Sequence, residues 1–119
     1  MDLVTAVPLN RKKEARRGYN QAQIFAHEVS NLIGKPSLST LNCLRQTEDQ
    51  SKLDFGARQK NVKGAFSLQK KTEVRGKSIL LVDDVFTTGS TLNECTKVLL
   101  VGGSKKVNVL TIARATLLY

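Results

Sequence analysis

Tryptophan is absent from this sequence, and aromatic side chains make up only 5% of its 119 residues. A core without large aromatic rings must be built from Leu, Val, Ile and Ala, which is typical of buried parallel sheets. No apolar run approaches the ~18 residues that a membrane-spanning helix requires, so we expect no membrane insertion. The length suits one hydrophobic core, and we predict a single domain over residues 1–119.

Cysteine and histidine are also scarce, since the chain has only Cys43, Cys95 and His27. The cysteines lie too far apart for a CxxC motif, so we predict neither a zinc site nor a redox motif. His27 lies on a predicted helix without a partner group in view, which favours a surface position over a catalytic one. The amino terminus does not resemble a signal peptide, and we expect a reduced, cytoplasmic protein.

Acidic residues are few, with 10 Asp and Glu against 19 Lys and Arg, which gives a net charge of +9. So basic a small domain attracts anions. Charge alone does not separate a phosphorylated metabolite from a nucleic-acid backbone, because Lys and Arg bind both. Four Phe and two Tyr are few for the base-stacking surface of a single-stranded DNA binder.

The stretch from Ile79 to Thr91 changes character twice. Four apolar residues, 79–82, predict a strand buried on both faces, which Asp83 and Asp84 are expected to end. A polar turn follows, and helical spacing of apolar residues then predicts a helix from about residue 91 to Gly102 and Gly103. The turn consists of Thr87, Thr88, Gly89, Ser90 and Thr91.

The other segments predict an α/β fold. An amphipathic helix is expected over Asn20–Ile33, with Asn20 as its N-cap, Gly34 as its end and apolar side chains at Ile24, Leu32 and Ile33 among others. Residues 45–63 form a long polar loop. Further strands are predicted over residues 3–9, 37–44, 64–69 and 107–113. We therefore expect a mainly parallel open sheet of about four or five strands flanked by helices.

Asp83 and Asp84 require compensation, because a buried unpaired carboxylate costs several kcal/mol. A divalent metal, the vicinal hydroxyls of a sugar, or neighbouring Lys and Arg would each supply it. The hydroxyl-rich turn precedes a helix, and helix amino termini favour phosphate. Carboxylates beside a phosphate-binding turn indicate a sugar-phosphate site.

Three other phosphate-related motifs are excluded by the residues. No G-x-x-x-x-G-K-[ST] phosphate loop and no G-x-G-x-x-G dinucleotide motif is present. A phosphoacceptor receiver domain requires another Asp on a later strand, and the only acidic residue after Asp84 is Glu94.

The segment LLVDDVFTTGST resembles the phosphoribosyl pyrophosphate (PRPP) signature of type I phosphoribosyltransferases. Other segments are similar to the ComF-like, competence-associated branch of that family, and the resemblance spans residues 4–114. They are RGYNQA at residues 17–22, the spacing of Arg45, Thr47, Gln50, Leu53, Arg58, Asn61 and Val62, and GAF at residues 64–66. Members of this branch often carry an amino-terminal cysteine-rich zinc module, which has no counterpart here and which either an abbreviated homologue or a truncated chain would lack.

The resemblance implies a role for each matching residue. Asp83 and Asp84 would bind the ribose hydroxyls directly or through Mg²⁺, and Thr87 to Thr91 would hold the 5′-phosphate. The pyrophosphate side would consist of Leu9, Asn10, Arg11, Lys12, Lys13 and Arg17. A mobile loop over the site would carry Arg45, Thr47, Gln50, Arg58 and Asn61.

The resemblance also implies an activity, the transfer of phosphoribose from PRPP to an acceptor with release of pyrophosphate. Two departures bear on it: Lys13 stands where an Arg is expected, and Thr87 stands where purine-type members carry an acidic base. The alternatives are a PRPP-sensing regulator and a non-catalytic accessory protein of DNA uptake that binds single-stranded DNA and competence proteins. The acceptor and the oligomeric state are not decided by the sequence.

Overall fold

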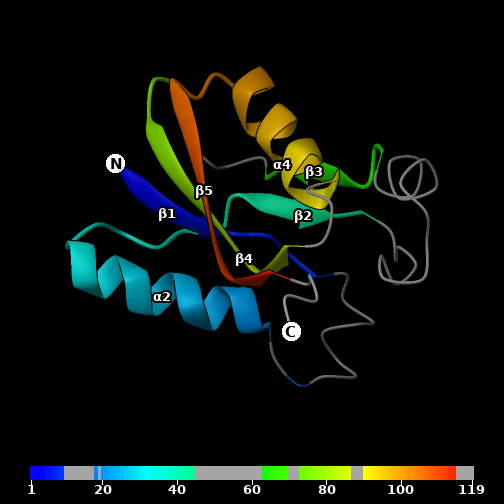
Figure 1. The fold of residues 1–119 in the computed structure, drawn as a ribbon. Helices are drawn as coiled ribbons and strands as arrows, with labels where there is room; N and C mark the ends of the chain where they lie inside the picture. The colour runs from blue at the N-terminus through cyan, green and yellow to red at the C-terminus, as the bar shows by residue number, and fades with distance from the viewer. Residues whose placement is uncertain (10–17, 19, 45–62, 70–72, 87–89, 115–119) are drawn as a thin grey trace.

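The structure, a computed structural model, describes residues 1–9, 18, 20–44, 63–69, 73–86 and 90–114 (Figure 1). Its elements follow the chain as β1 (Leu3–Ala6), α2 (Gln21–Ile33), β2 (Leu41–Cys43), β3 (Phe66–Leu68), β4 (Ser78–Phe86), α4 (Ser90–Val101) and β5 (Lys106–Arg114). Within these residues, no helix is both long and apolar enough to cross a bilayer.

A three-stranded parallel sheet in the order β1-β4-β5 forms the centre of the fold. Leu3 pairs with Ile79, and Ile79 pairs with Val107 on the other side. Strands β2 and β3 form a separate antiparallel pair, while Ser37 makes an isolated parallel bridge with Val4. The predicted α/β class with a mainly parallel sheet is confirmed, although the antiparallel pair was not anticipated.

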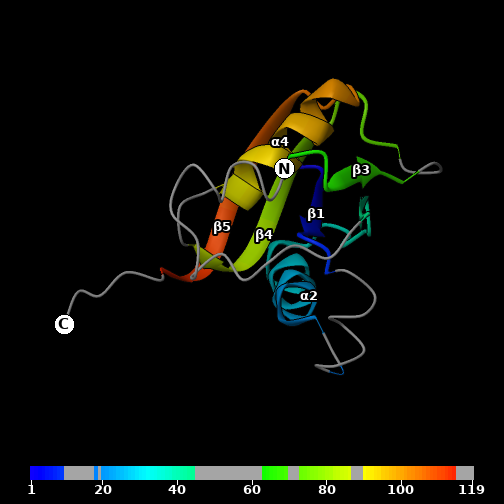
Figure 2. The same cartoon turned by 90° about the vertical axis from the view of Figure 1, so that its right-hand side faces the viewer.

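Helices α2 and α4 cover opposite faces of the sheet (Figure 2). On the α4 face, Ile79 and Leu81 pack with Leu99 in the larger hydrophobic core, which also takes in the β2–β3 pair. On the α2 face, Val82 packs with Ala26 in a smaller core. The apolar run 79–82 therefore alternates between two cores, as expected for a strand buried on both sides.

The ends of helix α2 lie where the sequence predicts them. The side chain of Asn20 caps the helix by accepting hydrogen bonds from the backbone N–H groups of Ala22 and Gln23. Gly34 ends it in the left-handed conformation, with φ 69°. The predicted apolar face is wrong in part, because Ile24, Leu32 and Ile33 are exposed. The helix instead packs through its small side chains, with buried Ala22, Ala26, Val29 and Ser30.

Strand β4 corrects a second prediction, that the two carboxylates end the strand. The strand continues through both to Phe86, and Asp83 pairs with Thr111 of β5. Pairing along a parallel ladder uses backbone groups, so polar side chains do not interrupt it where a neighbouring strand is long enough. The other strands differ from their predicted bounds only in length. Strand β1 ends before Pro8, as expected, because proline has no backbone N–H to donate to a neighbouring strand.

Candidate functional site

The adjacent carboxylates Asp83 and Asp84 lie near the carboxyl end of the central strand, and both are half-buried. The Oδ1 atom of Asp83 accepts a hydrogen bond of 2.9 Å from the backbone N–H of Asp84. Because side chains alternate along a strand, Asp83 lies on the α4 face and Asp84 on the α2 face. The two carboxylates therefore flank the end of the sheet where open α/β folds bind ligands.

Cys95 of α4 lies close enough to Asp83 for the charge of the carboxylate to affect its thiol. Burial raises the pKa of the Cys95 thiol well above its usual range, and the charge of Asp83 raises it further, followed by Cys43 and Glu94. The thiol is fully buried in the larger core. Cys95 is consequently a neutral packing residue and not a nucleophile.

Helix α4 begins at Ser90, and residues 87–89 separate it in the sequence from the end of β4 at Phe86. Thr91 is half-buried in its first turn and Leu92 is buried in the core. The first N–H groups of a twelve-residue helix are thus held near the end of β4, an arrangement that favours an anion. Thr87, Thr88 and Gly89 lie outside the described residues, as does the side chain of Ser90.

Most residues predicted for the pyrophosphate side and for the mobile loop also fall outside the described residues. These are Asn10, Arg11, Lys12, Lys13 and Arg17 of the first loop, and Arg45, Thr47, Gln50, Arg58 and Asn61 of the second. Their roles stay predictions. Leu9 is described, and it lines a pocket at the carboxyl end of β1.

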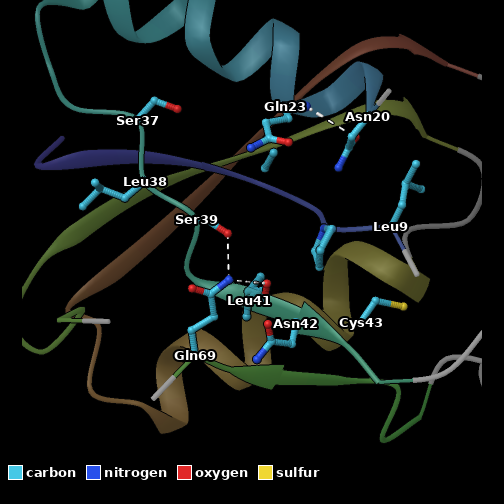
Figure 3. Close-up of a pocket in the computed structure, with 12 residues that line it drawn as sticks. Leu9, Asn20, Gln23, Ser37, Leu38, Ser39, Leu41, Asn42, Cys43 and Gln69 are labelled. Carbon is cyan, nitrogen blue, oxygen red and sulfur yellow. Dashed lines mark hydrogen bonds between the residues drawn. The ribbon is translucent and has the colours of Figure 1, made fainter. Parts of the chain in front are cut away.

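This pocket has a volume of about 400 Å³ and lies between α2, the end of β1 and the β2–β3 pair (Figure 3). Its walls come from Ala6, Pro8 and Leu9, from Asn20 and Gln23, from side chains between Ser37 and Cys43, and from Gln69. Sequence reasoning identified Asn20 only as a helix cap and missed Gln23, Asn42 and Gln69. These three residues come from distant segments and form no motif. The one sequence signal near the pocket was the RGYNQA segment, which contains Asn20.

Hydrogen bonds hold the pocket walls in place. Asn20 Nδ2 donates to the carbonyl of Val7 at 3.2 Å. Gln69 Nε2 donates to Ser39 Oγ at 2.7 Å and to the carbonyl of Leu41 at 3.3 Å (Figure 3). These bonds connect the pocket to both the helix cap and the antiparallel pair, which fixes the orientation of two of its amides.

The described part of the chain contains no group of three or more His, Cys, Asp or Glu side chains that would form a metal cluster. Cys43 and Cys95 do not form a disulfide. His27 is exposed on α2, as the sequence indicates. Asp83 and Asp84 are adjacent carboxylates, a type of oxygen donor that a hard cation accepts.

Comparison with known families shows which family the chain belongs to. Residues 15–116 match the family model of the phosphoribosyl transferase domain. The chain belongs to the phosphoribosyltransferase family. The predicted resemblance to type I phosphoribosyltransferases is thereby confirmed over most of the sequence.

Curated relatives place the chain in the competence-associated branch. Competence protein F of Haemophilus influenzae is 39% identical over 116 residues, which cover 96% of this chain and 51% of that protein. DNA utilization protein YhgH of Escherichia coli K12 is 33% identical over 114 residues, which cover 95% of this chain and 49% of that protein. Competence protein ComFC of Bacillus subtilis is 31% identical over 114 residues, which cover 95% of this chain and 45% of that protein. The chain thus spans about half the length of the curated relatives it matches.

Solved structures share the fold. One described as the allosteric regulatory enzyme of purine biosynthesis superposes with a TM-score of 0.62 at 21% identity, covering 93% of this chain and 22% of that one. Glutamine PRPP amidotransferase from Bacillus subtilis, complexed with ADP and GMP, superposes with a TM-score of 0.59 at 22% identity. The superposition covers 93% of this chain and 22% of that one. At these identities the likeness concerns the fold alone.

Proposed function

We propose that the chain binds PRPP at the carboxyl end of β4 and transfers its phosphoribosyl group to an acceptor, with release of pyrophosphate. The observation that carries the proposal is the carboxylate pair Asp83 and Asp84 near the carboxyl end of β4, the strand that precedes α4 in the chain. A carboxylate accepts strong hydrogen bonds from vicinal hydroxyls, and a helix amino terminus favours a phosphate. PRPP carries both groups on one ribose.

The donor set fits magnesium. Mg²⁺ takes oxygen ligands and is usually bound through one or two carboxylates together with substrate phosphates, and Asp83 and Asp84 supply such carboxylates. When bound, Mg²⁺ would neutralise charge on the pyrophosphate leaving group. Asp83 and Asp84 would orient the ribose while the bond from C1′ to pyrophosphate breaks and a bond from the acceptor to C1′ forms. The acceptor loses a proton in this step, which passes to the released pyrophosphate or to water.

A thermal-shift titration tests PRPP binding. We expect PRPP with Mg²⁺ to stabilise the wild-type protein by about 2.7 kcal/mol at a ligand concentration of 100 Kd. The doubly substituted Asp83→Asn/Asp84→Asn protein should lose this stabilisation, while Glu28→Gln, an exposed carboxylate on α2, should retain it. Equal stabilisation of all three proteins would exclude the site. Pyrophosphate release across a panel of acceptors then separates a transferase from a PRPP-sensing regulator, which binds PRPP without releasing pyrophosphate.

A second candidate function, binding of single-stranded DNA in DNA uptake, is favoured by a basic cluster at the opposite end of the sheet. Arg75, Lys105 and Lys106 are exposed there, and Lys77 is half-exposed. The two turns that carry them are joined by backbone hydrogen bonds, from Gly76 N to Gly103 O and from Lys105 N to Lys77 O. Relatives named for competence and DNA utilization also support this candidate.

Charge reversal tests the DNA candidate. Affinity for single-stranded DNA should fall with salt, with a log–log slope of about −0.7 for each phosphate contacted. Arg75→Glu/Lys106→Glu should weaken binding and flatten this slope. Lys63→Glu/Lys97→Glu changes the net charge equally at other exposed positions and serves as the matched control. If both variants bind alike, the basic cluster of Arg75, Lys77, Lys105 and Lys106 is not the DNA surface.

A further inference from the structure

The two edges of the parallel sheet are finished differently. On the β1 side, the segment after α2 closes the edge: the N–H of Val4 donates to the carbonyl of Pro36, and the N–H of Leu38 donates to the carbonyl of Val4, each at 2.9 Å. On the other side, β5 pairs with β4, and no other described strand lies beyond it (Figure 2). Within the residues that the structure describes, β5 is therefore the open edge of the sheet.

Strand β5 has few of the features that protect an edge strand from pairing. Such strands are usually short, interrupted by a Pro or a bulge, or charged in the middle. β5 has nine residues without a Pro, and its register with β4 is constant from Lys106 to Arg114, so it contains no bulge. Its middle carries the exposed side chains of Val109 and Leu110. A strand of this length presents ~30 Å of backbone to a neighbour.

The exposed side chains of β5 lie beside both hydrophobic cores. Val109 pairs with Leu81, which packs in the core on the α4 face, and Leu110 pairs with Val82, which packs in the core on the α2 face. Because side chains alternate along a strand, Val109 and Leu110 lie on opposite faces of the sheet. They are 52% and 36% exposed. An additional strand beside β5 would therefore cover apolar surface on both faces at once.

Charge indicates what kind of strand fits this edge. Lys105 and Lys106 are exposed at the amino end of β5, and Arg114 is its last residue. The sequence contains no acidic residue after Glu94. Two copies of β5 paired along their whole length would bring like charges together, with Lys106 opposite Arg114 in the antiparallel direction and beside a second Lys106 in the parallel one. Like charges on paired strands are destabilising, so the edge favours an acidic partner over a second copy.

We propose that the open edge of β5 binds an extended segment of another protein as an additional strand, and that this segment is apolar in its middle and acidic at its ends. Backbone hydrogen bonds supply the affinity in this mode of recognition, while side chains supply the specificity. Here Val109 and Leu110 select the apolar middle, and the cations at the two ends of β5 select the acidic flanks. The interaction uses the outer edge of β5 and does not depend on PRPP.

A synthetic peptide tests the proposal. Fluorescently labelled EEVTVTVTVEE should bind the full chain, as measured by anisotropy, and it should slow hydrogen exchange at backbone amides of β5 followed by NMR. The same peptide N-methylated at all its Val and Thr residues keeps the charges but loses the backbone donors, and it should bind at least tenfold more weakly. KKVTVTVTVKK, which keeps the backbone and reverses the charges, should also bind at least tenfold more weakly.

A charge in the middle of the edge should block the peptide. Val109→Lys is expected to weaken binding of EEVTVTVTVEE at least tenfold, because the strand can no longer cover an apolar side chain there. Val101→Lys is the matched control, since Val101 is 89% exposed on α4, outside β5, and its substitution should leave binding unchanged. The N-methylated peptide needs no variant, so a loss of folding in Val109→Lys does not remove the test.

Reversal of the flanking charges separates this interaction from general attraction of anions. Lys105→Glu/Lys106→Glu should weaken binding of the acidic peptide and strengthen that of KKVTVTVTVKK. Lys63→Glu/Lys97→Glu changes the net charge equally and should leave the preference for the acidic peptide in place. The proposal is overturned if the N-methylated peptide binds as tightly as its parent, which is the result expected of a purely ionic surface such as one for nucleic acid. It is also overturned if the variants do not change the preference, or if sedimentation shows a wild-type dimer that Val109→Lys dissociates.

Discussion

The two ends of the parallel sheet are built from different kinds of interaction. At the amino end, backbone groups close the structure, with hydrogen bonds from Asp2 N to Ser78 O at 2.7 Å and from Gly76 N to Gly103 O at 2.8 Å. At the carboxyl end, the same central strand carries two adjacent carboxylates, and a pocket lined by amides lies beside it. Strand β4 connects the two ends in nine residues.

This difference indicates how the chain separates stability from the binding of a small ligand. Backbone hydrogen bonds at the amino end are satisfied within the fold and leave little for a small ligand to contact. Carboxylates and amides at the other end stand outside the two hydrophobic cores, yet they are the groups that a ligand would bind. Substitutions at the two ends should therefore have separable effects, and the core between them should affect both.

The largest effect is expected from the core that both ends share. Leu99 on α4 is fully buried, and Leu99→Ala should lower the free energy of unfolding by about 2–5 kcal/mol because it leaves a cavity. Its neighbour Leu100 is 47% exposed, and Leu100→Ala should change stability by about 0.5 kcal/mol or less. Urea denaturation of both variants measures the contrast. Equal losses would mean that α4 does not pack through the face described.

A smaller effect is expected at the amino end, from Gly103. Its φ of 103° is strained for any side chain, and an added Cβ would lie 3.2 Å from Arg75 Cγ. Gly103→Ala should therefore cost about 2 kcal/mol, the upper part of the range for a left-handed non-glycine residue.

Gly34→Ala is the matched control for this substitution. Gly34 also has a positive φ, of 69°, but an added Cβ would meet nothing within 4 Å. Its cost should be about 1 kcal/mol, from the backbone conformation alone. Thermal or urea denaturation of the two variants gives the difference. A greater loss for Gly34→Ala would show that the turn at the amino end adapts easily.

Much of the fold follows from local sequence signals. Asn20 and Gly34 mark the ends of α2 because capping and left-handed conformation are properties of single residues. The apolar run 79–82 predicted the buried central strand for a similar reason. The predicted end of this strand at Asp83 was wrong because the length of β4 depends on its pairing with β5. The predicted burial of Leu32 was wrong because α2 packs through its small residues.

The candidate site was predictable only in part. Asp83 and Asp84 stand in one contiguous motif, so the sequence indicated them directly. The amide pocket brings together Gln23, Asn42 and Gln69 from three segments, and no periodicity or spacing links them. Tertiary structure alone creates such a site, and only the pairing of β2 with β3 places Gln69 near Leu41.

Alkylation of the two cysteines tests how firmly the core is closed near the carboxyl end. Burial and the nearby Asp83 raise the pKa of Cys95, so little thiolate forms at neutral pH. Cys43 is half-buried on β2 and should react with iodoacetamide at least tenfold faster. Mass spectrometry of the Cys43→Ser and Cys95→Ser variants assigns each rate. Similar rates would indicate that α4 opens from the sheet in the unliganded protein.

The smallest effect is expected from Asp2 at the amino end. A hydrogen bond of 2.7 Å from the backbone N–H of Ser78 lowers the pKa of this carboxyl below its ordinary value of 3.8, desolvation opposes this shift, and the terminal amine, Lys35 and Lys77 lower the pKa further. The folded state therefore favours the ionised form. Its stabilising contribution is present above pH 3.8 and is lost as the pH falls through the lowered pKa.

Asp2→Asn keeps an oxygen that accepts the Ser78 hydrogen bond but removes the charge. We expect a slightly lower melting temperature than wild type at pH 7, and a difference that shrinks as the pH is lowered towards 3. Melting curves recorded over this range, with Glu28→Gln as an exposed control, measure it. Because the carboxylate is exposed, salt should reduce the effect. Equal melting temperatures at pH 7 would assign the role of Asp2 to its hydrogen bond rather than to its charge.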